Sequence, residues 1–391
     1  MKQRILIFTD FYAPGYKAGG GLRTLVNMVE RFSDEFEFWI VTRNHDGWGD
    51  FTPYETVKSN EWNDLGDAKV FYFSDKTLSV SKLKSLWREV EPEAVYLNSF
   101  FSSLTVRILA LRRIKAAPKT PLIIAPEGEL SKSALAIKSK KKKALVTLAQ
   151  TAKLTRNVIW KAAAEPEKQN IQRLFGEKRK VFIAPNMPPK MIFSDYSPAS
   201  KPEKRSGCLK ILFLSRINRI KNLSFALSLL SQIQGEIHFD VLGKNDDEIY
   251  GRECQKLISQ MPSNVKVAVK DAVEYEQVPK TMSEYHFFIL PTLGENFGHV
   301  IIEALAAGSP VIISDQTPWR DLAEKNIGWD ISLGDEEKWL EVLRKCVEMS
   351  NDEFSQMAQN SRDFALNWLA APEVETANRG ILRFATAGAK P

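Results

Sequence analysis

The chain has 391 residues, of which 44% are hydrophobic and 26% are charged, so it is long enough for two domains and has the composition of a soluble globular protein. No apolar run reaches the length of a membrane span, and three scattered cysteines argue against a disulfide framework or a zinc site and favour a reducing cytoplasm. The net charge is +6, with 32 Lys and Arg against 21 Asp and Glu in residues 1–200 but 22 against 27 in residues 201–391. This asymmetry suggests two domains with different partners, and an uneven surface charge without a function is the alternative.

The first half predicts a parallel sheet, because short apolar runs alternate with segments of helical pattern. ILIFT (5–9) is the first expected strand, and LRTLVNMVERFS (22–33) has the spacing of an amphipathic helix. Further strands are expected at 36–42, 68–73, 94–99, 121–126, 157–162 and 181–186. Strands that alternate with helices indicate a doubly wound α/β fold, in which the carboxyl ends of the strands share one edge.

A glycine-rich turn, DFYAPGYKAGGG, lies between the first strand and the first helix. Gly19, Gly20 and Gly21 allow the backbone to come close to a phosphate at the N-terminus of the helix. The spacing is neither that of a Gly-x-Gly-x-x-Gly fingerprint nor that of a P-loop. A flexible turn without a ligand is therefore the alternative.

A cluster of lysines precedes a short apolar segment in the first half; its members are Lys138, Lys140, Lys141, Lys142 and Lys143. Such a segment predicts a surface that contacts anionic lipid or an anionic acceptor, and a solvated loop is the alternative. Nucleic acid is disfavoured as a partner, because no aromatic stacking pattern accompanies the lysines.

The polar segment from Ser194 to Gly207, SDYSPASKPEKRSG, has the composition of a domain linker. After it, strands are expected at 209–215, 236–243 and 265–269, with a helix near 222–233. Arg216 and Lys221 follow the first of these strands, in SRINRIKN. A forked guanidinium and an ammonium before a helix start suit a diphosphate, and two solvated loop cations are the alternative.

The stretch from His286 to Ser314 predicts a strand–loop–helix–strand unit. HFFILP has the character of a buried parallel strand, TLGENFG that of a turn, and VIIEALAAG that of a helix ended by Gly308, before the strand VIIS. In an open parallel sheet, ligands bind at the loop that follows a strand. This loop is therefore the leading candidate for a binding site.

Three backbone amides and two carboxylates give this candidate site its chemistry. The amides of Asn296, Phe297 and Gly298 precede the helix, where anions or hydroxyl groups are favoured. Glu295 and Glu303 can each accept hydrogen bonds from a diol. The alternative is that Glu295 caps the helix and Glu303 is a solvated helix residue.

The string GENFGHVIIEALAAGSPVI resembles the donor-site signature of retaining glycosyltransferases of family 4, in which seven residues separate two glutamates. The resemblance implies the GT-B fold, with two doubly wound Rossmann-like domains that face a cleft, at 1–195 and 206–371, and a helix at 372–391 that returns to the first domain. For this last segment, a frayed tail is the alternative from the sequence alone. It implies no metal and no cofactor, with a UDP- or GDP-linked sugar as the donor substrate. It implies catalytic roles for Glu295, Arg216 and Lys221, and donor contacts by Gly20, Gly21, Asn296, Phe297, Gly298 and Glu303.

Several positions depart from the pattern of this family. His45 is the only histidine of the first half, which would be the acceptor domain. Glu127 stands where a basic residue is expected. The segment KAAAEPE, which begins at Lys161, lacks a hydroxyl residue before Glu165, and Asp271 replaces a glycine near the nucleobase. These departures concern the acceptor and the base, while the residues expected at the donor phosphates are all present.

The resemblance implies transfer of a sugar to a saccharide or lipid-linked saccharide acceptor in a surface polysaccharide pathway (exopolysaccharide, O-antigen or capsule). The expected location is the cytoplasm, at the inner face of the cytoplasmic membrane. Two other functions are compatible with the sequence. One is a non-catalytic subunit that binds a nucleotide sugar in a membrane assembly, and the other is a nucleotide-sugar epimerase on the same fold.

Overall fold

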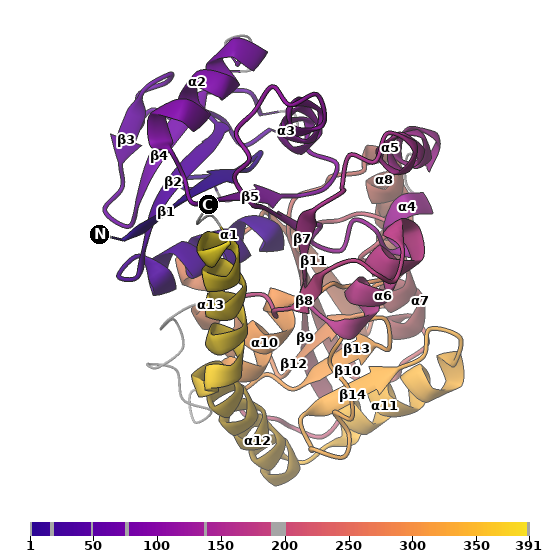
Figure 1. Ribbon diagram of the computed structural model, residues 1–391. Coiled ribbons are helices and arrows are strands. Elements are labelled where there is room, and N and C mark those ends of the chain that lie inside the picture. The colour runs from indigo at the N-terminus through magenta and orange to yellow at the C-terminus, as the bar shows by residue number, and fades with distance from the viewer. Residues whose placement is uncertain are drawn as a thin grey trace. The chain divides into compact units, whose positions relative to one another are not determined.

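The computed structural model describes residues 2–15, 19–47, 50–74, 78–136, 139–188 and 201–388. The chain divides into two compact units (Figure 1). Unit 1 comprises Met1–Lys190 and Pro372–Pro391, and unit 2 comprises Met191–Ala371.

Unit 1 is built on a sheet in which the described residues form eight strands, in the order β3-β4-β2-β1-β5-β6-β7-β8. All neighbours are parallel except β3 and β4, which are antiparallel. The strands are β1 (Gln3–Phe8), β2 (Phe36–Arg43), β3 (Trp62–Asp64), β4 (Ala68–Phe73), β5 (Ala94–Asn98), β6 (Leu122–Ala125), β7 (Val158–Ala162) and β8 (Val181–Ile183). The helices are α1 (Gly20–Phe32), α2 (Val80–Val90), α3 (Ser103–Arg113), α4 (Lys132–Ala136), α5 (Ser139–Thr151), α6 (Glu165–Phe175) and α13 (Pro372–Ala387).

The apolar runs of the first half form the core strands of this sheet, which confirms the strands expected from the sequence. Every residue of β5 and β6 is buried, because helices cover both faces of a doubly wound parallel sheet. One detail was wrong. Gly20 and Gly21 are the first residues of α1, not part of the turn, and Gly19 is the N-cap with φ 78°.

Helix α13 packs beside α1 in unit 1 (Figure 1). Arg31 of α1 pairs with Glu375, and Arg379 donates to Glu35 at 2.7 Å. Buried apolar residues of α13 join the core, and Asn378 donates to the carbonyl oxygen of Pro185 at 2.8 Å. A helix far along the chain therefore completes the unit that begins at the N-terminus.

Unit 2 contains a parallel sheet whose strands, among the described residues, follow the order β11-β10-β9-β12-β13-β14. The strands are β9 (Cys208–Leu214), β10 (Glu236–Leu242), β11 (Val265–Lys270), β12 (Phe287–Leu290), β13 (Val311–Ser314) and β14 (Gly328–Ile331). The helices are α7 (Leu223–Leu230), α8 (Glu248–Ser259), α9 (Val278–Ser283), α10 (His299–Ala306), α11 (Glu336–Glu348) and α12 (Asn351–Ala370), with a 3-10 turn at Tyr275–Gln277. The strand order reverses direction between β9 and β12, and such a switch point is where open α/β sheets bind ligands.

The predicted linker, Ser194 to Gly207, does not connect the two units over its whole length. Residues 194–200 lie outside the described residues, whereas the following residues pack into unit 2. Lys201 donates to the carbonyl oxygens of Met282 and Tyr285, at 2.7 and 2.9 Å. Lys204 is buried and donates to the carbonyl oxygen of Val347 at 2.8 Å. The sequence prediction was wrong here because long lysine stems can cross apolar surface and end on buried carbonyl groups.

His286, at the base of β12, should make unit 2 sensitive to acid. Its Nδ1 accepts from the amide of Lys210, and its Nε2 donates to the carbonyl oxygen of Glu203. Burial, reinforced by nearby lysines, lowers the pKa of His286 to about 4, from about 6.5 in an unfolded chain. The neutral ring stabilises the fold above pH 6.5, and this contribution is lost as the pH falls toward 4, by on the order of 3 kcal/mol in total.

We therefore expect the free energy of unfolding to fall more steeply between pH 6.5 and 4.5 in the wild type than in His286→Asn. Urea denaturation at a series of pH values measures both slopes. Equal slopes would show that the imidazole of His286 does not control this transition.

Candidate functional site

Two loops meet at the switch point of unit 2, one after β9 and one after β12. The amide of Leu293 donates to the carbonyl oxygen of Ile220 at 2.7 Å, and Thr292 Oγ1 donates to the same oxygen at 3.0 Å. Ser314, at the end of β13, donates to the carbonyl oxygen of Thr292. Hydrogen bonds to backbone carbonyl groups therefore hold the two loops together, without a contribution from the predicted site residues.

The loop after β12 presents a helix N-terminus, as the sequence predicts. Gly298 is the N-cap of α10 with φ 79°, and a Cβ there would lie 2.8 Å from Ile301 Cδ1. Phe297 is buried, and its carbonyl oxygen accepts from Trp319 Nε1 at 2.6 Å. Within the described residues, the amides of Asn296, Phe297 and Gly298 donate no hydrogen bond. They can therefore receive a hydroxyl group or an anion.

The structure brings two of the predicted residues together. Lys221 Nζ donates to Glu295 Oε1, and both side chains are largely buried, with exposed fractions of 15% and 11%. The amide of Glu295 donates to the carbonyl oxygen of Gln316 at 2.8 Å, which fixes the start of the carboxylate-bearing loop. An ammonium group, which can bind phosphate, thus lies next to a carboxylate, which can accept hydrogen bonds from hydroxyl groups.

Arg216 and Glu303 have partners that the sequence did not reveal. Arg216 Nη1 donates to Asp246 Oδ2 at 3.0 Å. Glu303, on α10, is buried, and its Oε1 accepts from the hydroxyl group of Tyr275 at 3.2 Å. Asp246 follows β10 and Tyr275 follows β11. Their positions after strands were the one signal that could have identified them, because strand ends converge at one edge of the sheet.

A cavity of about 300 Å³ opens at the same edge of unit 2, beside the ends of β9, β10 and β11. Its walls combine apolar side chains, Ile217, Leu223 and Val269 among them, with polar groups such as those of Asn245, Gln255 and Asp271. This size and lining suit a small organic ligand. Asp271, noted in the sequence as a departure, lies on the wall of this cavity.

In unit 1, the predicted glycines lie beside an unexpected carboxylate. A Cβ on Gly21 would lie 3.9 Å from the Cγ of Glu127, and Glu127 has a left-handed backbone with φ 52°. Thr24 Oγ1 donates to the carbonyl oxygen of Gly20 at 3.0 Å. A carboxylate therefore lies near the N-terminus of α1, where the glycines were predicted to approach a phosphate.

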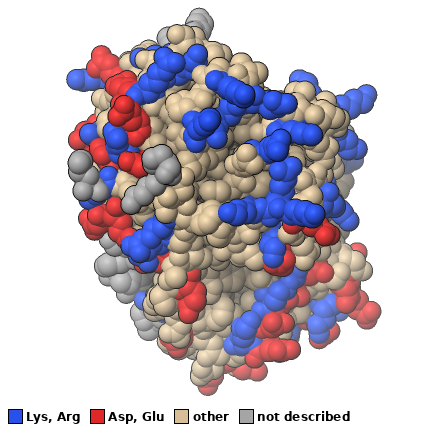
Figure 2. Space-filling model, in the orientation of Figure 1, with Lys and Arg blue, Asp and Glu red and all other residues tan. Residues whose placement is uncertain are grey.

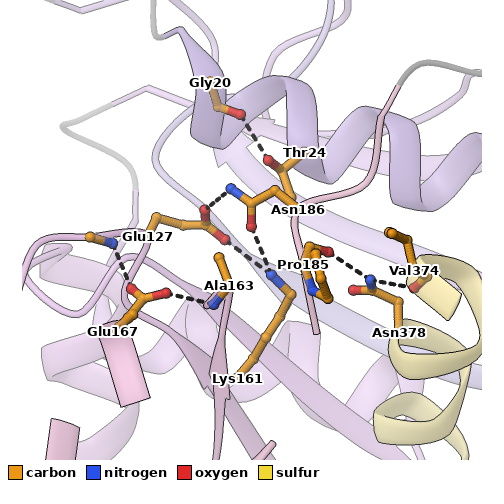
Figure 3. A network of polar contacts seen from close by, with 11 residues as sticks. Gly20, Thr24, Glu127, Lys161, Ala163, Glu167, Pro185, Asn186, Val374 and Asn378 are labelled. Carbon is orange, nitrogen blue, oxygen red and sulfur yellow. Dashed lines mark hydrogen bonds and ion pairs between the residues drawn. The ribbon is translucent and has the colours of Figure 1, made fainter. Parts of the chain in front are cut away.

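Glu127 and Lys161, two of the departures, contact each other (Figure 3). Lys161 Nζ lies 3.7 Å from Glu127 Oε1 and donates to Asn186 Oδ1 at 3.0 Å. Asn186 Nδ2 in turn donates to Glu127 Oε2 at 2.8 Å. A basic side chain of the neighbouring strand β7 thus lies beside Glu127.

A second glutamate borders this network. Glu167 is buried and accepts from the amides of Gly128 and Ala163, at 2.6 and 2.7 Å. Burial, with Glu127 adding to it, raises the pKa of Glu167 to about 7. Glu165, which the sequence analysis singled out, is exposed and pairs with Lys168. His45 is buried, and its Nδ1 accepts from the amide of Gly47.

Comparisons with known proteins agree with this geometry. Residues 199–364 match the glycosyl transferases group 1 family. The O-antigen chain mannosyltransferase RfbU of Salmonella typhimurium is 24% identical over 138 residues, which are 33% of this chain. The aligned part spans only 38% of the length of RfbU.

Two solved structures resemble the whole chain. HepE of Anabaena, in complex with UDP-glucose, has a TM-score of 0.72 at 16% identity over 98% of this chain and 99% of HepE. WaaG, a glycosyltransferase involved in lipopolysaccharide biosynthesis, has a TM-score of 0.69 at 15% identity over 98% of this chain and 100% of WaaG. The chain therefore has the GT-B fold of two Rossmann-like units, which confirms the fold predicted from the sequence, and it carries a glycosyl transferases group 1 domain.

Proposed function

We propose that the chain is a retaining, metal-independent glycosyltransferase of family 4. It transfers a sugar from a UDP- or GDP-linked donor to a saccharide or lipid-linked saccharide acceptor in the synthesis of a surface polysaccharide. The observation that carries the proposal is the pairing of Lys221 with Glu295 beside three amides that donate no hydrogen bond in the described part of the chain, within a glycosyl transferases group 1 domain. The relatives support the class of substrate, since one is an O-antigen mannosyltransferase and another was solved with UDP-glucose.

In this proposal, each site residue of unit 2 has one role. Arg216 and Lys221 neutralise the diphosphate, and the amides before α10 stabilise the negative charge that develops on the diphosphate as its bond to the sugar breaks. Glu295 accepts hydrogen bonds from the sugar, while Glu303, aided by Tyr275, holds the ribose. The bond between the anomeric carbon and the diphosphate breaks, a bond to the acceptor oxygen forms on the same face, and the leaving phosphate takes the acceptor proton. The two cations take the charge-neutralising part that a metal ion plays in other transferases.

A screen of nucleotide sugars by thermal shift tests the proposal, because a ligand that binds only the native state raises its stability. The donor that shifts the melting temperature should then be hydrolysed slowly in the absence of an acceptor, and chelator should leave the rate unchanged. Proton NMR of the product should show the anomeric configuration of the donor. An inverted product would exclude the retaining mechanism, and tight binding without turnover would favour the non-catalytic subunit.

Unit 1 carries a basic surface that suits an anionic membrane. Residues 101–164 contain 14 Lys and Arg but only two acidic residues, Glu127 and Glu129, and both carboxylates are bound inside the unit. Figure 2 shows basic side chains gathered over the upper part of unit 1. We define the basic surface by eight of the exposed cations of this segment: Arg113, Lys115, Lys132, Lys140, Lys141, Lys143, Lys153 and Arg156.

Exposed apolar residues accompany these cations, which favours lipid as the partner. Ile114 is 70% exposed and Leu148 is 52% exposed. Arg113 donates to the carbonyl oxygen of Ala152 at 2.8 Å, which ties the end of α3 to the end of α5. Lys138, part of the predicted cluster, lies outside the described residues. None of the described helices has the length and apolar character needed to cross a bilayer.

We expect the protein to co-sediment with vesicles that contain anionic lipid, and less so as salt is added, because salt screens exposed charges. Replacing Lys140, Lys141 and Lys143 with glutamine should reduce the bound fraction several-fold, since each cation contributes about 1 kcal/mol near an anionic surface. The control replaces Lys256 and Lys266 of unit 2, both exposed, and should bind like the wild type. If the triple variant also binds like the wild type, the cluster is a solvated surface.

A further inference from the structure

Both cations assigned to the diphosphate already hold a carboxylate of the same unit. Arg216 pairs with Asp246, and Lys221 pairs with Glu295. Glu295 has a task in the proposed reaction, because it contacts the sugar. Asp246 has no role in that reaction, although only 10% of its side chain is exposed and it pairs with Arg216.

The backbone fixes the position of Asp246. The amide of Ile217 donates to the carbonyl oxygen of Lys244 at 2.8 Å, and the amide of Asp246 donates to the carbonyl oxygen of Ile217 at 3.2 Å. A Cβ on Gly243 would lie 2.0 Å from the carbonyl oxygen of Ser215, so the loops after β9 and β10 run in close contact. The fold therefore places Asp246 next to Arg216, where the two side chains pair in the absence of a ligand.

We propose that Asp246 is an internal counter-ion that occupies the place of the donor's diphosphate and is displaced from Arg216 when the donor binds. This inference rests on the proposed function and adds to it a residue that competes with the donor for Arg216. Without a ligand, the two carboxylates balance the two cations. A diphosphate offers more negative charge and more acceptor oxygens than the carboxylate, so Arg216 exchanges one partner for a better one.

The exchange favours donors that carry a diphosphate. A nucleoside without phosphate cannot compete for Arg216, and it leaves the pair with Asp246 intact. Because 36% of the Arg216 side chain is exposed, a phosphate can reach the guanidinium without opening the fold. The pair itself is expected to add little to stability, as is usual for ion pairs with an exposed partner.

A role in orienting Arg216 predicts the opposite change in diphosphate affinity, so a measurement of affinity can separate the two roles. If Asp246 is a displaced counter-ion, Asp246→Asn removes the competitor and strengthens diphosphate binding. If Asp246 only orients Arg216 toward the ligand, the same variant weakens binding. The sign of the change in affinity therefore separates the two roles, whereas a merely structural role would alter the melting temperature alone.

The experiment is isothermal calorimetry with inorganic pyrophosphate, UDP, GDP and the free nucleosides. The proteins are the wild type, Asp246→Asn, Asp246→Ser and the control Asp240→Asn. Asp240 also lies on the β10 side of unit 2 and pairs with Lys270 and Tyr285, but it contacts neither Arg216 nor Lys221. We expect pyrophosphate and the preferred nucleoside diphosphate to bind Asp246→Asn and Asp246→Ser about three- to tenfold more tightly, with nucleoside affinity and the control unchanged.

Weaker or unchanged diphosphate binding in folded Asp246 variants would overturn the counter-ion role and leave the proposed function in place. If the wild type and all variants bind no diphosphate, the proposed function and this inference fall together. Melting temperatures of the variants show whether each is folded.

Discussion

Lys161→Met is expected to destabilise unit 1 by about 3–5 kcal/mol, because it leaves a buried carboxylate without its cation. Lys161 is 2% exposed, and its ammonium group bridges Glu127 and Asn186. Methionine fills a similar volume but offers no charge and no donor. Urea denaturation, with hydrogen exchange of unit 1 peptides as the readout, measures the loss.

Two further variants test the cause of this loss. The double variant Lys161→Met, Glu127→Gln removes both charges and should recover most of the stability, since a buried ion pair can often be replaced by neutral groups. Lys168→Met is the matched control, because Lys168 pairs with exposed Glu165 and its loss should cost less than about 1 kcal/mol. A double variant as unstable as Lys161→Met would show that packing, and not charge, is responsible.

Glu295→Gln is expected to lower turnover by on the order of 100-fold without weakening the binding of nucleoside diphosphate. Glu295 contacts the sugar in the proposed mechanism, so its loss should lower kcat and kcat/KM together. Lys221→Ala, by contrast, should weaken nucleoside diphosphate binding at least about tenfold, because a charge-assisted hydrogen bond is lost. Steady-state kinetics and calorimetry separate the two effects.

Glu253→Gln provides the control for these variants, since Glu253 is an exposed carboxylate of unit 2 that pairs with Arg219. It should match the wild type in both measurements. Equal losses of nucleoside diphosphate affinity in Glu295→Gln and Lys221→Ala would contradict the division of labour between sugar and phosphate.

The parallel strands other than β14 were predictable because burial on both faces of a sheet requires continuous apolar runs. β3 was not predicted. It has three residues, none of them buried, and pairs with β4 in the antiparallel direction. β14 was also missed, because the run GWDI contains a glycine and an aspartate and lacks a strand pattern. Such short strands are defined by their neighbours in the sheet more than by their own residues.

The site was predictable only where its parts are close in sequence. The run from Glu295 to Glu303 is continuous, and Arg216 and Lys221 lie five residues apart. Asp246 lies 30 positions from Arg216, and Tyr275 lies 28 positions from Glu303. Such pairs form because of the order of strands in the sheet, which no local pattern contains. For the same reason Glu127 and Lys161 look like two separate departures in the sequence, although they are one ion pair in the structure.

The contribution of α13 to unit 1 has a consequence for the order in which the protein can be made. Multidomain chains usually fold from the N-terminus during synthesis, but unit 1 needs a helix that the ribosome delivers only after all of unit 2. Until then, the surface that receives Ile381, Leu382 and Ala385 stays uncovered, and the carbonyl group of Pro185 lacks the donor Asn378. Because unit 2 is a single continuous segment, it can fold completely before unit 1, whose synthesis began first, receives its last helix.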